Sequence, residues 1–217
     1  MIHLRLNHNP ESPLRILCLG AHSDDIEIGC GGSILRLIDQ YPDSRIDWVV
    51  FSARGIRRSE AEHAAGLFAG SDHLENLILK EYPDGFLPHI AADVKSSFEE
   101  LKQLVSPDVI FTHQRHDAHQ DHRLLSELTW NTFRNNFILE YEIPKFDGDL
   151  GQPSVFIPLD LSFLDAKVNH LMESFASQHS KHWFDDSTFR ALMRLRGMEC
   201  NSPSGYAEAF YCRKLVL

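Results

Sequence analysis

The sequence has little cysteine, no excess of positive charge and no long hydrophobic run. Its 217 residues include four cysteines, which form no CxxC pair and no dense framework, so a disulfide scaffold is not expected. A formal net charge of −10 argues against a nucleic-acid-binding surface, which is normally basic. No window approaches the roughly 20 apolar residues of a membrane helix, and the first residues lack the pattern of a secretory signal. We therefore expect a cytoplasmic protein with no transmembrane segment and no nucleic-acid partner.

The composition that remains is that of an ordinary globular protein. Hydrophobic residues make up 43% of the chain and charged residues 24%. A chain of this length can bury a sizeable core, and no internal repeat or long linker divides it. We therefore expect residues 1–217 to form a single domain.

Strand-like and helix-like segments alternate along the first two thirds of the chain. This alternation predicts an α/β fold of the Rossmann-like, doubly wound kind, with a mostly parallel sheet and helices on both faces. Right-handed crossovers favour three strands that wind outward one way and a fourth that lies beside the first. The ends of strands one and four would then flank the topological switch point, where such sheets bind ligands. The predicted strands span 15–20, 46–52, 74–79, 108–112 and 137–143, and the predicted helices span 32–40, 59–69, 90–105 and 119–134.

The pattern changes after about residue 144. A loop rich in proline, glycine and aspartate spans 144–151, and helices are predicted over 159–178 and 189–196. A last strand-like stretch spans 207–216. We expect this part of the chain to complete the sheet and to wall the pocket.

Two polar clusters follow the first and fourth predicted strands. The first is GAHSDD at 20–25, and the second is HQRHDAHQDH at 113–122. Catalytic zinc commonly takes three nitrogen or oxygen ligands and leaves a fourth position to water. Both clusters fall at the predicted switch point, which favours a shared metal site over two unrelated structural roles.

The spacing within each cluster suits metal binding. His22 and Asp25 are three apart at a strand-to-helix turn, and His119 and His122 are three apart at a helix start, so up to four ligands could converge. Adjacent side chains in a turn diverge, so one aspartate can hold the metal while its neighbour, Asp24, faces the bound water. The structural alternative is that these aspartates cap the helices that follow them.

The two clusters also resemble the motifs of a known family. AHSDDIEIGCGG resembles the AHPDDxExGxGG signature of the PIG-L/LmbE-like N-deacetylases, and DAHQDH resembles their DxHxDH motif. RRSEA at 57–61 resembles the RxxEA helix start of the family, and YAEAF at 206–210 resembles a tail of its bacterial members. Ser23 stands where proline is usual, which alters the rigidity of the turn but removes no functional group. The matches extend over nearly the whole chain in the same order.

The resemblance implies a role for each matched position. The implied roles are metal ligands at His22, Asp25 and His122, the general base at Asp24, stabilisation of the oxyanion or protonation of the leaving amine at His119, and substrate binding at Arg57. If the register of the RxxEA match is shifted by one, Arg58 takes the role of Arg57. The structural alternative is that Arg57 is a solvated arginine in the first turn of a helix.

These roles imply zinc-dependent hydrolysis of the N-acetyl group of an N-acetylated amino sugar, of the N-acetylglucosamine type, with release of acetate and a free amine. Zinc would lower the pKa of a water to about 7, Asp24 would accept the proton, and a protonated His119 would stabilise the oxyanion. Fe²⁺ or another divalent cation remains open. The amino sugar would be a small molecule or a glycolipid precursor, and a homo-oligomer is left open.

Two alternatives remain beside this function. The same metal site could hydrolyse a different small amide, or the domain could bind a metal or a sugar without catalysis. The presence of Asp24 and His119 argues against a binder, which needs the ligands but no base.

Several other residues are of interest with roles left open. His113 and His116 are candidates for the pocket lining, and Asp117 for orienting a ligand histidine. The others are Arg54 and Gly55, expected at the mouth; Tyr206 and Glu208, expected in packing; Cys30, considered as a ligand but favoured as a buried structural residue; and Gly29, Gly31 and Gly32, expected to permit close packing.

Overall fold

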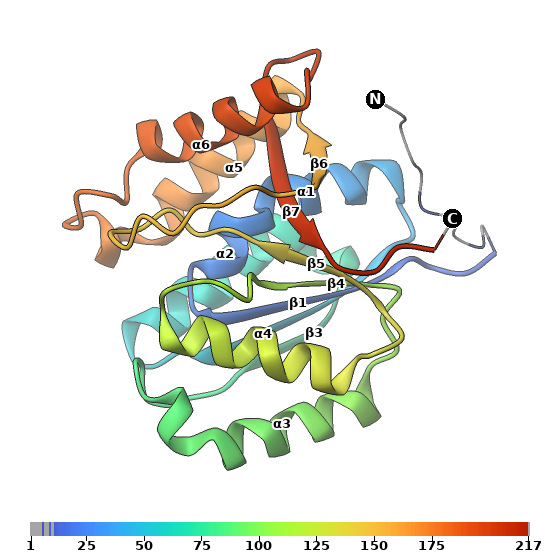
Figure 1. Ribbon diagram of the computed structural model, residues 1–217, viewed down its shortest axis with the longest axis vertical. Coiled ribbons are helices and arrows are strands. Elements are labelled where there is room, and N and C mark those ends of the chain that lie inside the picture. The colour runs from blue at the N-terminus through green and yellow to red at the C-terminus, as the bar shows by residue number, and fades with distance from the viewer. Residues whose placement is uncertain (1–5, 7–8, 10, 217) are drawn as a thin grey trace.

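The computed structural model describes residue 6, residue 9 and residues 11–216, and its helices lie on both sides of a central sheet (Figure 1). The start of the chain, for which we expected no secretory signal, lies largely outside these residues. In the described part the sheet has seven strands in the order β3-β2-β1-β4-β5-β7-β6. The strands are β1 (Arg15–His22), β2 (Arg45–Ser52), β3 (Leu74–Leu79), β4 (Val109–His113), β5 (Phe137–Tyr141), β6 (Val155–Pro158) and β7 (Ala207–Cys212).

The strand order confirms the predicted topology. β1 pairs in parallel with both β2 and β4, while β3 and β5 extend the parallel sheet on either side. β7 pairs antiparallel with β5 and with β6 at the far edge. The winding direction therefore reverses between β1 and β4, and the carboxyl ends of these two strands form the switch point.

The helices form two layers, one on each face of the sheet (Figure 1). Side chains alternate between the layers along β1, where Ile16 and Cys18 pack into one hydrophobic cluster and Leu17 and Leu19 into the other. The first cluster includes residues of α1 (Asp25–Gln40), α2 (Ile56–His73), α5 (Leu161–Ser174) and α6 (Asp186–Glu199), and the second includes residues of α3 (Ala91–Leu104) and α4 (Gln120–Thr132).

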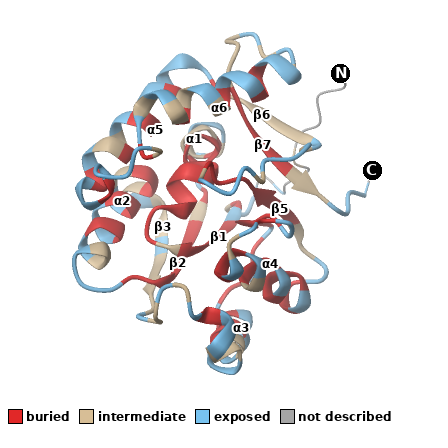
Figure 2. Cartoon of the chain, turned by 60° about the vertical axis from the view of Figure 1, so that its left-hand side comes forward, coloured by how far each residue is buried: buried red, intermediate tan, exposed pale blue. Residues whose placement is uncertain are grey.

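The central strands are buried on both faces, as Figure 2 shows by colour. Every residue of β4 is buried, and so is every residue of β1 between its two ends. Strands covered from both sides read as continuous hydrophobic runs, which is why they could be recognised in the sequence. The polar residues at the ends of β1 and β4 are therefore held on rigid, well-packed elements.

Helix α1 begins at Asp25, well before the start at residue 32 that the sequence predicted. The glycines of its first turns explain both the error and the packing. A methyl group at Gly29 would overlap the ring of Tyr141, and one at Gly31 would overlap the ring of Phe68. Glycine at these positions lets α1 lie close against β5 and α2, as the sequence led us to expect.

The last third of the chain completes the sheet, with two differences from the prediction. The four-residue strand β6 was not predicted, and the helix predicted over 159–178 divides into α5 and the 3-10 turn η2 (Ala176–Gln178). A further 3-10 turn, η1 (Leu87–Ile90), precedes α3. None of the helices in the described residues has the length and hydrophobicity needed to cross a bilayer.

Candidate active site

The turn after β1 orients two neighbouring aspartates differently. β1 ends at His22 and α1 begins at Asp25, whose Oδ2 accepts a hydrogen bond of 2.7 Å from the His22 backbone N–H. This bond folds the Asp25 carboxylate back toward His22. Asp24 is the N-cap residue of α1, yet its side chain makes no capping hydrogen bond. The capping role that we considered for Asp24 is therefore absent.

Ser23 lies between these residues and is fully buried. Its hydroxyl has no hydrogen-bond partner among the described residues. The side chain therefore acts as a small spacer, which explains why serine can stand where proline is usual in the family motif.

The second cluster lies at the end of β4 and the start of α4. His119 is the N-cap residue of α4, and its Nδ1 accepts a hydrogen bond of 3.2 Å from the Asp121 backbone N–H. His122 lies in the first turn of the helix and is buried. The prediction placed His119 inside the helix, whereas the capping bond places it just before the helix begins.

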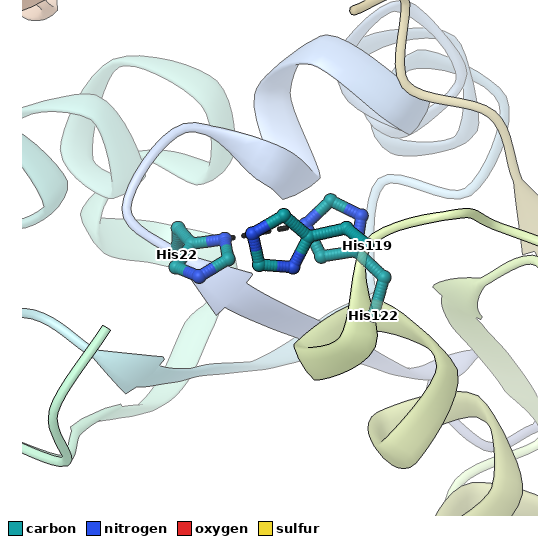
Figure 3. A group of neighbouring side chains, drawn as sticks. All are labelled: His22, His119 and His122. Carbon is teal, nitrogen blue, oxygen red and sulfur yellow. Dashed lines mark hydrogen bonds between the residues drawn. The ribbon is translucent and has the colours of Figure 1, made fainter. Parts of the chain in front are cut away.

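The structure brings the three predicted metal ligands together at the switch point. Nδ1 of His22 lies 3.2 Å from Nε2 of His122. Asp25 places Oδ2 3.3 Å from the same nitrogen of His22 and Oδ1 3.5 Å from Nε2 of His122. Figure 3 shows the side chains of His22, His119 and His122 gathered at one place, with a dashed line for the contact between His22 and His122.

These separations fit a divalent metal ion. Bonds of about 2.0–2.1 Å in a tetrahedral zinc site place neighbouring ligand atoms roughly 3.3–3.4 Å apart, close to the distances between the three side chains. Burial opposes a charge on His22, yet the carboxylates around it raise its pKa well above the ordinary value. The same negative field favours a bound cation.

The second ring nitrogen of each histidine contacts a carboxylate, an arrangement typical of metal-binding histidines. Nδ1 of His122 lies 3.0 Å from Oδ2 of Asp117, as the sequence led us to expect. Nε2 of His22 lies 3.2 Å from Oδ2 of Asp121 and 3.0 Å from Oδ1 of Asp84. Each histidine is therefore oriented with one nitrogen toward the shared centre.

Asp24 and Asp25 have pKa values shifted in opposite directions. Burial raises the pKa of Asp24, an effect that Arg57 opposes and the charge of Asp25 reinforces. Burial alone would also raise the pKa of Asp25, but the three histidines around it hold that pKa well below the ordinary value. Asp25 is therefore suited to hold a cation, and Asp24 to accept a proton.

The family comparison agrees with this geometry. A model of the PIG-L family, described as GlcNAc-PI de-N-acetylase, matches residues 17–133, which is more than half of the chain. Both polar clusters lie inside the match. The chain belongs to the PIG-L family. Membership places it among the hydrolytic N-deacetylases.

Solved structures share the fold of this PIG-L chain. The conserved protein TT1542 from Thermus thermophilus is 20% identical with a TM-score of 0.74, over 94% of this chain and 96% of that one. The N,N'-diacetylchitobiose deacetylase from Pyrococcus horikoshii is 20% identical with a TM-score of 0.66, over 96% of this chain and 87% of that one. GalB, the 4-carboxy-2-hydroxymuconate hydratase from Pseudomonas putida, is 19% identical with a TM-score of 0.73, over 94% and 98%. Because a deacetylase and a hydratase share this fold, these likenesses establish architecture alone.

The surroundings of His119 favour a neutral ring and not the protonated imidazolium that we expected. Its Nδ1 accepts a hydrogen bond, so the ring proton resides on Nε2. Burial lowers the pKa of His119, and the neighbouring His122 and His22 lower it further. The structure therefore favours a neutral His119 that donates from Nε2.

Arg57 lies at the site, but its guanidinium is already engaged. Nη2 is 2.8 Å from Oδ1 of Asp24 and Nη1 is 2.9 Å from Oε2 of Glu60. Arg58 lies farther out and pairs with the exposed carboxylates of Glu62 and Glu81. The register that selects Arg57 is therefore the one that reaches the site.

The contacts of Asp84 and Asp121 with the site were not predicted from the sequence, and the role of His113 was left open. Asp121 is fully buried and accepts hydrogen bonds from the backbone of Gly85 and Leu87, which ties the loop after β3 to the site. His113 is buried beside Asp25, with Nε2 3.2 Å from Oδ2. The DxHxDH motif contained Asp121, but no spacing rule showed that it would contact His22.

Three overlapping groups of described side chains have atoms close enough to share a metal ion. His22, His119 and His122 each occur in two of the groups, and Asp25 occurs in one of them with His122, but the predicted set of His22, Asp25 and His122 is not itself one of the groups. The groups are His22, His119 and His122; His22, Asp84, His119 and Asp121; and Asp25, His113 and His122.

The other residues of interest lie in packing or at the surface. His116 is exposed, as are Arg54 and Gly55 after β2. The Cys30 thiol is buried and donates to the Ile26 carbonyl. Glu208 is buried and accepts hydrogen bonds from the backbone of Gly32 and Ser33 and from Lys167, and Tyr206 packs under the guanidinium of Arg194.

Proposed function

We propose that this PIG-L chain hydrolyses the N-acetyl group of an N-acetylated amino sugar, of the N-acetylglucosamine type, with zinc as its metal. The observation that carries the proposal is the convergence of His22, Asp25 and His122, with Asp24 alongside and free of any capping role. The family description and the sugar substrate named for the Pyrococcus horikoshii deacetylase support an amino sugar. We propose further that the chain acts as one domain in the cytoplasm, alone or as a homo-oligomer, on a small-molecule or glycolipid-precursor substrate.

His22, Asp25 and His122 would hold the metal, which supplies Lewis acidity toward a water and an amide carbonyl when bound. Asp117 and Asp121 orient the two histidines through their second ring nitrogens. Their role is to keep the ligand nitrogens aimed at a common point.

Asp24 would act as the general base. It accepts one proton of the attacking water while a C–O bond forms at the acetyl carbon. Its raised pKa brings it closer to the neutral operating range, where a base is most effective. When the C–N bond breaks, the same proton passes to the departing nitrogen, so that acetate and a free amine leave.

His119 would stabilise the negative charge that develops on the carbonyl oxygen. A neutral imidazole with its proton on Nε2 can donate one hydrogen bond to that oxygen. Preorganised donors of this kind contribute about 10²–10³-fold to the rate. The capping bond from Asp121 holds the ring in the donating tautomer.

The test is acetate release from a panel of N-acetylglucosaminides by metal-stripped chain to which Zn²⁺ is returned. We expect acetate and the free amine in equal amounts, and no product from the stripped chain. Acetate release from simple amides but from no sugar would instead favour the alternative of a different small amide. Stoichiometric zinc without turnover on any amide would contradict the proposal and favour a non-catalytic binding domain.

A further inference from the structure

The contacts of Asp24 point to a residue that controls the base. Its carboxylate is almost fully buried, with 8% of the side chain exposed. Among the described residues its one polar partner is Arg57, at 2.8 Å. A carboxylate that makes no capping bond would otherwise be free to rotate, so this ion pair determines where its oxygens point.

Arg57 is itself held from several sides. Glu60 contacts Nη1 at 2.9 Å, and the ring of Phe175 lies under the guanidinium, 5.3 Å from its centre. Only 22% of the Arg57 side chain is exposed. One positive charge is thus shared by two buried carboxylates, which leaves less of that charge for an anionic substrate group.

Glu60 is fixed in turn by η2. Its Oε1 accepts a hydrogen bond of 2.8 Å from the Ser177 backbone N–H, and its Oε2 accepts one of 2.7 Å from the Ser177 hydroxyl. The side-chain amide of Gln178 donates to the same hydroxyl at 2.8 Å. A continuous series of polar contacts therefore joins the start of α1, the first turn of α2 and η2.

We propose that Arg57 is a positioning residue for Asp24, held in place by Glu60 and Ser177, and not the residue that binds the substrate. The inference rests on the proposed function, in which Asp24 is the base. Displacement of a reacting group by about 1 Å can cost 10²-fold in rate. The need to hold the Asp24 carboxylate in place would therefore explain why Arg57 lies against it and is held in turn by Glu60. The planar fork of arginine suits this task because it contacts two carboxylates at once.

The two roles of Arg57 have different kinetic signatures. A residue that binds substrate equally in the ground and transition states raises KM when removed and leaves kcat unchanged. A residue that positions the base lowers kcat and leaves KM nearly unchanged. The distinction does not depend on which amino sugar is used.

The experiment compares Arg57→Ala, Arg57→Lys and Glu60→Gln with the wild-type chain loaded with zinc. We expect Arg57→Ala to keep its zinc and its KM and to lose about 10²-fold in kcat. Added guanidinium should restore part of that kcat, because it can occupy the space beside Asp24. Glu60→Gln, which keeps the shape and removes one charge, should lose less kcat with KM unchanged.

Arg58→Ala is the matched control, since Arg58 lies next in sequence and pairs with exposed carboxylates. It should retain wild-type kcat and KM. A raised KM with unchanged kcat in Arg57→Ala would overturn the inference and return Arg57 to substrate binding. Should Arg57→Ala fail to fold, as judged by zinc content and melting, Arg57→Lys and Glu60→Gln decide by the same two constants. Absence of acetate release by the wild-type chain would overturn the proposed function itself, and with it the base that Arg57 positions.

Discussion

At the scale of single residues, the turn after β1 gives two adjacent carboxylates different surroundings. Asp25 faces three histidines, which lower its pKa, while Asp24 faces Arg57 from a buried position that raises its pKa. Pairs of titratable groups whose surroundings separate their pKa values are typical of acid–base sites. The turn after β1 points the two side chains in different directions, which separates the proposed ligand, Asp25, from the proposed base, Asp24.

Asp117 should matter for metal affinity although it is not a proposed ligand. It accepts from Nδ1 of His122, and loss of such partners costs about 10–100-fold in metal affinity or activity. We expect Asp117→Asn to weaken zinc binding by that amount in a competition titration. Asp149→Asn is the control, because Asp149 shares the Lys145 contact but does not touch His122. Equal affinities in both variants would remove Asp117 from this role.

One substitution can separate the capping role of His119 from its proposed catalytic role. Its side chain caps α4, and its free Nε2 would donate to the oxyanion. Asparagine is a good N-cap residue, so His119→Asn should keep the melting temperature and the zinc while turnover falls by about 10²-fold. His119→Ala should lose turnover and also about 0.5–2 kcal/mol of stability. If His119→Asn loses zinc instead, His119 is a fourth ligand.

Sequence spacing predicted up to four ligands among His22, Asp25, His119 and His122, because both short motifs follow predicted strands, and the family resemblance selected His22, Asp25 and His122 from these. Asp84 and Asp121 escaped prediction for a different reason. Both contact His22 only because the loop after β3 folds against the start of α4, which is a tertiary contact with no local periodicity. The pair of Arg57 and Glu60 is local to α2, but the anchoring of Glu60 by Ser177 likewise depends on how α2 meets η2.

At the scale of elements, helix α1 brings the site and the core together. Its first residue is a proposed ligand, and its second turn carries the glycines that allow contact with β5. The sequence placed the helix start too late because glycines are ordinarily read as breaks. Their value here is the absence of a side chain, which only the packed structure reveals.

The close approach at Gly29 can be tested directly. Gly29→Ala would place a methyl group into the ring of Tyr141, whose hydroxyl donates to the Leu19 carbonyl, so the ring cannot move freely. We expect a loss of about 1–3 kcal/mol in the free energy of unfolding. The control is Gly66→Ala on the exposed side of α2, where nothing lies within 4 Å. There alanine should be neutral or stabilising by up to about 1 kcal/mol, and equal effects in chemical denaturation would contradict the packing account.

The parallel strands were predictable because burial on both faces makes them continuous hydrophobic runs. β6 was missed because it has only four residues and ends at Pro158. Such a short edge strand is defined by its pairing with β7, far along the chain, and not by its own sequence. The predicted order of the first four strands was confirmed because right-handed crossovers leave few choices.

At the scale of the whole molecule, the site joins segments that are about a hundred residues apart. The His22–His122 contact spans the reversal of winding between β1 and β4, so folding must be nearly complete before the ligands meet. Because the unfolded chain lacks this arrangement, zinc should bind the folded state selectively and stabilise it.

We expect zinc at 100 times its dissociation constant to stabilise the chain by about 2.7 kcal/mol. Thermal melting with and without a chelator measures the effect. His22→Ala should abolish the shift, whereas His116→Ala, at an exposed histidine of the same cluster, should leave it intact. A zinc-dependent shift that survives in His22→Ala would place the metal elsewhere.

In the proposed function, a metal held at the switch point and a separate base, Asp24, together cleave an N-acetyl group. The decisive measurement is acetate release per bound zinc, made side by side on the wild-type chain and Asp24→Asn. We predict that both bind one zinc ion per chain and that Asp24→Asn turns over about 10²–10⁴-fold more slowly. Equal turnover by the two chains at equal zinc content would contradict the claim, because the proton would then be accepted by another group.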